Sequence, residues 1–191
     1  MGIYPVTQAQ WRWATRRSPS RFKGNDRPVD SVSWNDCQEF CSRLSKKTGQ
    51  RFCLPSEAQW EYACRAGTTT PFFFGLTIST DQANYDSNFI YSGGREGIYR
   101  EQTTAVGSFP ANAWGLYDMH GNVWEWCQDW YGPYQDGDEK AYRFSDPGTT
   151  RVLRGGSWYY FPVNCRSGHR DDGDPSYRND YHGCRVLLCL D

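Results

Sequence analysis

The residue types best suited to specific contacts gather in one stretch of the chain, residues 159–182. None of its 24 residues is Lys, Glu, Gln, Met or Trp, although these five types supply 31 of the 191 residues. Tyr, Asp, Ser, Gly and Asn dominate instead, the mixture used by antibody loops, because rings give large contact area with few rotors and small polar groups adapt their hydrogen bonds. We therefore predict a ligand-binding face made of Tyr159, Tyr160, Phe161, His169, Asp171, Asp172, Asp174, Tyr177, Asp180, Tyr181 and His182.

Other interpretations of this stretch stay open. Short Asn- and Asp-rich blocks are also typical of solvated loops, although gathered rings at a surface usually mark an interface. The acidic residues Asp171, Asp172 and Asp174 could bind calcium, but ion pairs with the three neighbouring arginines are the simpler account. His169 and His182 could bind a metal, but a histidine isolated in a loop is more often a contact residue.

A second group with possible chemistry lies between Asp118 and Glu125, around the pair Gly121-Asn122. Ca²⁺ prefers carboxylate and carbonyl oxygens in a flexible loop, and this stretch offers two carboxylates. The alternative is that Asp118 and Glu125 accept hydrogen bonds from backbone amides and arginines. The sequence favours a structural calcium site without excluding that alternative.

The eight cysteines do not predict a metal centre. No two of them form a Cys-x-x-Cys pair, which argues against a zinc site of the common spacing. We favour buried free thiols, which behave as small apolar residues, over disulfides, whose pairing the sequence does not give.

We predict three helices that position these groups, and the residues at the start of each helix indicate where it begins. Thr7 is a plausible N-cap for a helix ending near Arg17. Ser33 with Asp36 resembles a capping box and precedes a helix that Gly49 stops. A full capping box, Ser56 with Gln59, begins a third helix that we expect to end at Gly67.

The rest of the chain predicts short strands and much irregular chain. Between residues 68 and 150 the periodicity fades. Such a stretch in a compact domain indicates either that elements have been wrongly assigned or that the fold is held by aromatic packing and bound ions, and we favour the second. We expect a core around Trp60, Trp114, Trp124, Trp126 and Trp158, and a loop-rich α+β fold. The expected strands are residues 104–106, 116–117, 123–126 and 152–153.

Length and charge narrow the class of protein. A chain of 191 residues suits a single domain over residues 1–191. Its net charge of −1 argues against nucleic acid as a partner, and no apolar stretch is long enough for membrane insertion. We expect a soluble protein, cytoplasmic or displayed at a surface through a part absent from this chain; the sequence does not decide between the two.

Five motifs stand in the order found in the formylglycine-generating enzyme (sulfatase-modifying factor) family, which the chain resembles over nearly its whole length. They are PVTQAQW at 5–11, LPSEAQWEYA at 54–63, GLYDMHGNVWEW at 115–126, RVLRGGSW at 151–158 and GCRV at 183–186. The resemblance implies a C-type-lectin-like fold. It also implies a calcium site whose ligands would be the Asp118 side chain, the Gly121 and Val123 carbonyls, and Glu125.

The resemblance also raises an enzymatic alternative, oxidation of a sulfatase cysteine by copper(I). The family's enzyme holds copper between two thiolates five residues apart, as this soft ion prefers. Counted from Ser157, the first position is Tyr160 and only the second, Cys165, is a cysteine. We therefore expect no copper and no catalysis, with the oxidase as the second hypothesis.

The last segment resembles the variable protein of a diversity-generating retroelement, of bacterial or phage origin. In such systems adenine-specific mutagenesis of Asn codons yields Tyr, Phe, His, Asp, Gly, Ser, Asn and other types, but never the five types absent from residues 159–182. Fixed-looking residues such as Pro162, Arg170 and Pro175 alternate with these positions. The resemblance implies a variable region over residues 151–188 and a protein ligand.

Overall fold

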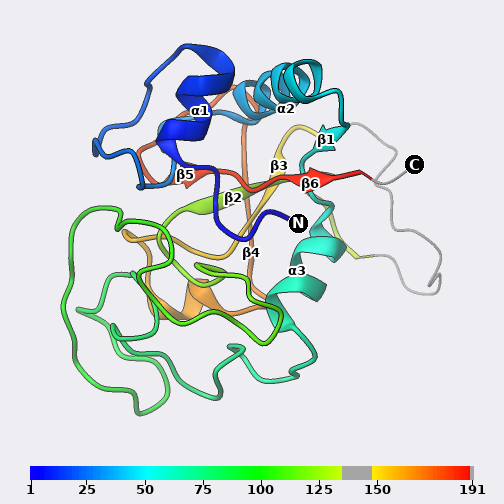
Figure 1. The fold of residues 1–191 in the computed structure, drawn as a ribbon. Coiled ribbons are helices and arrows are strands. Elements are labelled where there is room, and N and C mark those ends of the chain that lie inside the picture. Colours follow the sequence, from blue (N-terminus) through cyan, green and yellow to red (C-terminus); the bar gives the residue numbers. More distant parts are fainter. Residues whose placement is uncertain (135–147, 190–191) are drawn as a thin grey trace.

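The three expected helices are present in the computed structural model, which describes residues 1–134 and 148–189. Helix α1 spans Gln8–Thr15, α2 spans Trp34–Thr48 and α3 spans Glu57–Arg65 (Figure 1). Each begins with a complete capping box, in which the side chains of the N-cap and of the third helical residue each accept from the other residue's backbone N–H. Helix α3 ends one residue earlier than expected, because Ala66 itself takes the left-handed conformation, with φ of 45°.

The strands form one four-stranded and one two-stranded sheet. The larger sheet has the order β4-β3-β2-β5, antiparallel except for the parallel pair β2–β5, and the smaller one pairs β1 with β6. The strands are β1 Phe52–Cys53, β2 Trp124–Trp130, β3 Arg151–Arg154, β4 Arg170–Gly173, β5 His182–Gly183 and β6 Leu187–Leu188.

Two expected strands exist, near 123–126 and 152–153, and two do not. Residues 104–106 and 116–117 use their backbone groups in isolated contacts: Val106 N–H donates to the Asp26 carbonyl at 2.7 Å and Tyr117 N–H to the Ile3 carbonyl at 3.0 Å. Single bonds of this kind link distant segments without building a ladder. Apolar pairs in these stretches therefore mark contacts rather than strands.

The sheet separates two layers of the core (Figure 1). On one side Trp124, Trp126 and Leu153 pack with α1 and α2, and on the other Cys127 and Val152 pack with α3. Four of the five expected core tryptophans are buried. The prediction for Trp114 was wrong: its ring is 47% exposed and lies against Tyr62 on the surface.

The long irregular stretch between α3 and β2 is held by buried amides as well as rings. Asn84 and Asn122 are both fully buried. Asn122 accepts from Thr104 N–H at 2.9 Å through its side chain, while its own N–H donates to the Asn84 carbonyl at 2.8 Å. These hydrogen bonds pair buried backbone N–H and C=O groups that are not paired within a helix or a β-sheet.

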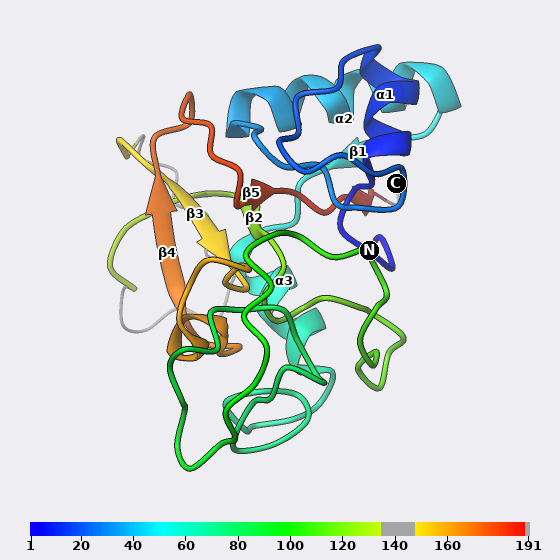
Figure 2. The ribbon, with the colours of Figure 1, turned by 90° about the vertical axis from the view of Figure 1, so that its left-hand side faces the viewer.

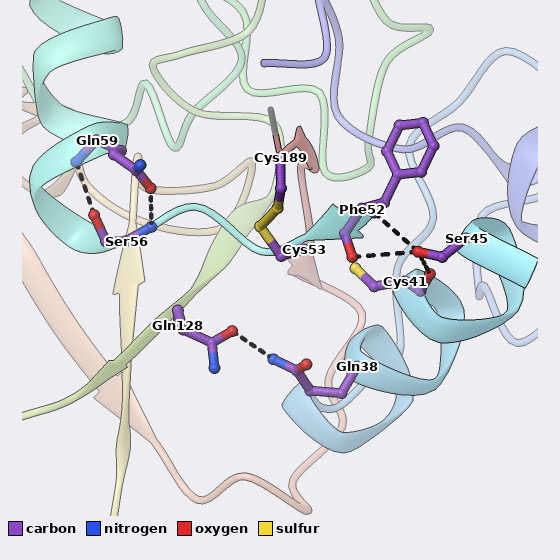
Figure 3. The surroundings of a disulfide bond; sticks show 9 residues. All are labelled: Gln38, Cys41, Ser45, Phe52, Cys53, Ser56, Gln59, Gln128 and Cys189. Carbon is purple, nitrogen blue, oxygen red and sulfur yellow. Dashed lines mark hydrogen bonds between the residues drawn. A yellow bond between two sulfur atoms is a disulfide. The ribbon is translucent and has the colours of Figure 1, made fainter. Parts of the chain in front are cut away.

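Six cysteines are buried free thiols, as favoured from the sequence, and two form a disulfide. The free thiols are Cys37, Cys41, Cys64, Cys127, Cys165 and Cys184. Cys53 on β1 bonds to Cys189, just after β6 (Figure 3). The bond joins positions 136 residues apart in the chain and fastens the last residues of the described fold to its first strand. None of the helices in the described part of the chain is both long and apolar enough to cross a bilayer.

Candidate ligand-binding face

The segment that carries the predicted face leaves β3 at its end and returns to the sheet twice. It passes through a 3₁₀ turn, Pro162–Cys165, and pairs with β3 as β4. It then continues through residues 174–181 and re-enters the sheet beside β2 as β5. Figure 2 shows β4 and the following loop on one side of the molecule, with the chain termini on the other. Tyr159 and Tyr181, which stand at opposite ends of the segment, are thereby brought together.

Tyrosine rings from both ends of this segment form one connected group. The rings of Tyr159 and Tyr181 stack with their centroids 5.7 Å apart and 7° between their planes. The Tyr160 ring meets the Tyr181 ring edge-on at 5.3 Å and the buried Trp124 ring at 5.4 Å. Rings held by neighbours in this way offer contact area with little further loss of rotamer freedom on binding.

The eleven predicted residues differ in how far they reach the surface. Tyr159, Phe161 and Tyr177 are 53%, 45% and 51% exposed. Two acids, Asp172 and Asp174, are exposed as well. The half-buried members are Tyr160, His169, Asp171, Asp180 and Tyr181.

His182 does not lie on this face, so its prediction as a contact residue was wrong. It is only 4% exposed, since β5 places its ring against Trp126 at 5.1 Å and beneath Tyr181 at 4.8 Å. The residue supports the exposed rings from below.

Asp171, Asp172 and Asp174 were expected to form ion pairs with the neighbouring arginines, and they do not. Arg170 binds Glu57 of α3 through two nitrogens, at 2.5 and 2.8 Å, and Arg178 binds Asp36 of α2 in the same way. Arg166 donates to the Val163 carbonyl. Asp180 instead pairs with Arg21. Arg170 and Arg178 thus fasten residues 170–178 to α3 and α2, and Asp171, Asp172 and Asp174 have no ion pair within the described residues.

Successive side chains alternate across a strand, so Asp171 and Asp172 of β4 point to opposite faces of the sheet. Asp171 lies on the same face as Trp126 and is half-buried; burial raises the pKa of its carboxyl. Asp172 is exposed. The three acids therefore do not form a single calcium-binding cluster, and no group of three or more His, Cys, Asp or Glu in the described ranges is placed to hold a metal.

The sequence missed a second segment that borders the face, residues 86–99. The Phe89 ring lies 4.2 Å from the Phe161 ring, and Asp86 N–H donates to the Tyr160 carbonyl at 3.0 Å. Tyr99 stacks near Trp158 at 6.5 Å. Phe89 is 50% exposed. The signal available in the sequence was the presence of Phe89, Tyr91 and Tyr99 in a stretch with three glycines.

Burial of His182 has a consequence for stability that can be measured. Burial lowers the pKa of His182 to about 3, below its ordinary 6.5, so the folded state loses stability as pH falls from 6.5 toward 3. We expect His182→Phe, which keeps the ring, to remove this loss. The difference in unfolding free energy between variant and wild type should grow by about 1 kcal/mol per pH unit between pH 6.5 and 4.5 in urea titrations. A difference that stays constant with pH contradicts it.

The predicted calcium residues Asp118 and Glu125 are both buried but have different surroundings. One Asp118 oxygen accepts from Gly107 N–H at 2.7 Å, while Oδ1 is buried and has no hydrogen-bond partner. Burial raises the pKa of Asp118 to about 6. A cation would satisfy the orphaned oxygen and favour the ionised form, so this carboxylate fits a metal ligand.

The negative charge of the Glu125 carboxylate is already balanced by a buried ion pair with Arg185. Its carboxylate accepts from Arg185 at 2.9 Å and from the Trp60 indole N–H at 2.6 Å. Arg185 is fully buried and also donates to the carbonyls of Gly2, Ile3 and Tyr117. The contacts of Glu125 therefore match the alternative of an arginine partner, and those of Asp118 fit a cation.

Cys165, the thiol at the second copper position, is fully buried, and burial raises the pKa of its thiol well above the ordinary value. Its sulfur lies 3.8 Å from the Phe161 carbonyl oxygen and packs so closely against the backbone that a Cβ on Gly156 would lie 2.5 Å from it. A thiol that stays protonated in such a site is a poor metal ligand and nucleophile.

Comparisons with known proteins agree with this architecture. The family model of the sulfatase-modifying factor enzyme 1-like domain matches residues 2–189. The formylglycine-generating enzyme of Mus musculus is 32% identical over 190 residues, which cover 92% of this chain and 48% of that protein. The serine/threonine-protein kinase pkn1 of Chlamydia caviae is 37% identical over 163 residues, covering 83% of this chain and 23% of the kinase. The chain thus spans less than half the length of these curated relatives.

Among solved structures, Treponema denticola variable protein 1 superposes with a TM-score of 0.80 and 29% identity, covering 95% of this chain and 81% of that one. The expected C-type-lectin-like α+β fold and the resemblance to variable proteins are thereby confirmed. Since the family model spans nearly the whole chain, the protein belongs to the family of sulfatase-modifying factor enzyme 1-like domains.

Proposed function

We propose that this chain is a non-catalytic binding protein that presents a hypervariable face, within residues 159–182, to a protein ligand. The observation that carries the proposal is the group of exposed rings, Tyr159, Phe161 and Tyr177, resting on a fixed support of buried rings and helix-bound arginines. A rigid support with replaceable outer residues is what a diversified paratope requires.

The likeness to a variable protein supports this proposal, and the composition of the face supports diversification by a retroelement. The exposed positions 159, 161, 172, 174 and 177 carry Tyr, Phe or Asp, all of them residue types that adenine mutagenesis of an Asn codon yields. The fixed arginines Arg170 and Arg178 point away from the face to Glu57 and Asp36, so replacement of the outer residues leaves the supporting ion pairs intact.

The oxidase remains the second candidate because of the identity with the mouse enzyme. Tyr160 at the first copper position and the buried, protonated Cys165 both weigh against it. The oxidase hypothesis predicts copper(I) uptake and conversion of a cysteine in a sulfatase peptide, and we expect neither.

The test of the proposed function is whether the face tolerates replacement and yields binders. Positions 159, 161, 172, 174 and 177 would be randomised among Tyr, Phe, His, Asp, Gly, Ser and Asn, displayed on phage and selected on hen lysozyme as an arbitrary protein target. We expect folded members and binders of micromolar affinity or better.

A matched library controls for generic surface binding. It would vary five exposed positions on and after α2, namely Ser42, Arg43, Lys46, Gln50 and Arg51. Equal yields of binders from the two libraries, or loss of folding in most members of the first, contradict the proposed function.

We also propose that Ca²⁺ binds at Asp118, with the carbonyls of Gly121 and Val123 and with Glu125 shared between the ion and Arg185. When bound, the ion would pin the loop between residues 118 and 125 against the sheet. A ligand at 100 times its dissociation constant stabilises the fold by about 2.7 kcal/mol, so millimolar calcium should raise the melting temperature by about 5–10 °C over chelator. Asp118→Ala should abolish this difference. A wild-type protein that melts at the same temperature in both solutions contradicts calcium binding.

A further inference from the structure

An apolar pocket of about 520 Å³ lies outside the proposed binding face and shares no residue with it. Its walls come from the first residues of the chain, from α1 and α2, and from β1. The volume lies within the range of about 300–1,000 Å³ typical of pockets for small molecules. Large apolar side chains line it, among them Ile3, Tyr4, Trp13, Phe40, Leu44 and Phe52.

The pocket combines a rigid floor with exposed apolar walls. Phe40 is 1% exposed and stacks on the Trp11 ring at 4.9 Å, which fixes the floor. Ile3 and Trp13 in the walls are 54% and 51% exposed. Large apolar side chains gathered around a hollow mark a binding site rather than ordinary surface.

Two hydrogen-bond donors lie at or beside this pocket. Lys47 does not line the pocket, but its ammonium lies 4.5 Å from the centre of the ring of Trp13, which does, and donates to the Trp13 carbonyl at 2.6 Å. Gln10 uses its side-chain oxygen to accept from Thr7 N–H, and its amide NH₂ has no acceptor within residues 1–134 and 148–189. A cation and a free amide donor together favour an anionic group at the mouth.

The excess of basic side chains in this part of the chain also favours an anionic ligand. Residues 1–51 carry ten of the chain's 21 basic side chains but only four of its 22 acidic ones. Among the described residues, no acidic side chain lines the pocket, and neither Lys46 nor Lys47 has an ion pair. Helices α1 and α2 themselves carry four of these basic side chains against two acids, a small excess that favours an anion; they are Arg12, Arg43, Lys46 and Lys47 against Asp36 and Glu39.

We propose that this pocket binds a free single-chain amphiphile with an anionic head, of the fatty-carboxylate class. The apolar tail would lie against Ile3, Leu44 and Phe52, with the carboxylate at Lys47 and Gln10. This site is separate from the face at residues 159–182, and the proposal does not depend on the proposed function.

The first test is calorimetric titration of the wild-type protein with dodecanoate below its micelle concentration. Decanoate, two methylenes shorter, should bind about ten- to twentyfold more weakly, because each methylene buried in an apolar site contributes about fourfold. Equal binding of the two acids, or no binding of dodecanoate, would overturn the proposal.

The position proposed for the anionic head group is tested by removing the charge of Lys47, with the neighbouring Lys46 as the control. Lys47→Gln should weaken dodecanoate about tenfold and leave neutral dodecanol unchanged, while Lys46→Gln, one residue away and also exposed, should change neither. A Lys47→Gln variant with unaltered dodecanoate affinity would contradict the assignment of the head.

The wall is tested with two exposed tryptophans. Trp13→Ala should weaken both amphiphiles at least tenfold, whereas Trp114→Ala, at a ring 47% exposed outside the pocket, should not. Circular dichroism of both variants checks that each is folded. Sedimentation with phosphatidylglycerol vesicles separates a free amphiphile from a lipid surface: vesicle binding that survives Trp13→Ala, without dodecanoate binding, would replace the pocket by a membrane contact.

Discussion

Arg185→Ala should lower the melting temperature by about 10 °C. The guanidinium is fully buried and donates to Glu125 and to three backbone carbonyls, two of them in the first residues of the chain. Removing one partner of a buried pair leaves an uncompensated charge and costs about 3–5 kcal/mol, and each kcal/mol shifts the midpoint by about 2–4 °C in a domain of this size. Thermal melts followed by circular dichroism measure the effect.

Arg178→Ala is the matched control for that experiment. Arg178 also contacts its acid, Asp36, through two nitrogens, at 2.6 and 2.8 Å, but its side chain is 57% exposed. Exposed pairs of this kind contribute about 0–1 kcal/mol, so the midpoint should fall by less than about 3 °C. Equal losses for the two variants would show that Arg185 does not hold the chain start to the sheet in the way the contacts indicate.

Alanine at positions 159 and 177 should destroy binding in a lysozyme binder selected from the face library. Both positions are about half exposed in the wild type, and contact residues at the centre of an interface contribute about 2 kcal/mol or more each. Together the two changes should weaken affinity at least 100-fold, measured by surface plasmon resonance, while the melting temperature moves by less than about 2 °C.

Two controls make that prediction specific. Tyr62→Ala removes an even more exposed tyrosine, 70% exposed on α3, and should leave affinity unchanged. Tyr181→Ala should lower the melting temperature, because its half-buried ring stacks between Tyr159, Tyr160 and His182. Binding that persists without side chains at 159 and 177 would place the contact surface elsewhere.

Helices were predictable here because their signals are local. In each capping box the two partners stand three residues apart, so Ser33 with Asp36 and Ser56 with Gln59 mark the helix starts without knowledge of the fold. Strand β4 was not predictable, because Arg170–Gly173 is polar and becomes a strand only by pairing with β3. The two-residue strands carry too little pattern to distinguish them from loops.

The candidate site likewise has features that the local sequence predicts and features that depend on the fold. Composition alone indicated the rings of residues 159–182, since residue type decides which side chains offer contact area. Partner choice needed the fold: Asp180 selects Arg21, and Arg170 and Arg178 select acids on helices more than 100 residues away in the chain. Burial of His182 likewise follows from its place in β5, which no local pattern reveals.

Sequencing of the genomic locus tests the central claim, a diversified face, most directly. The account predicts a near-copy of the stretch encoding residues 151–186 beside a reverse transcriptase gene, differing from this sequence only where the copy carries adenine. Codons for Tyr159, Phe161 and Tyr177 should align with Asn codons in that copy, and codons for Arg170 and Arg178 should be identical in both. Absence of the copy, or differences at bases other than adenine, would contradict diversification and leave a family member with one fixed partner.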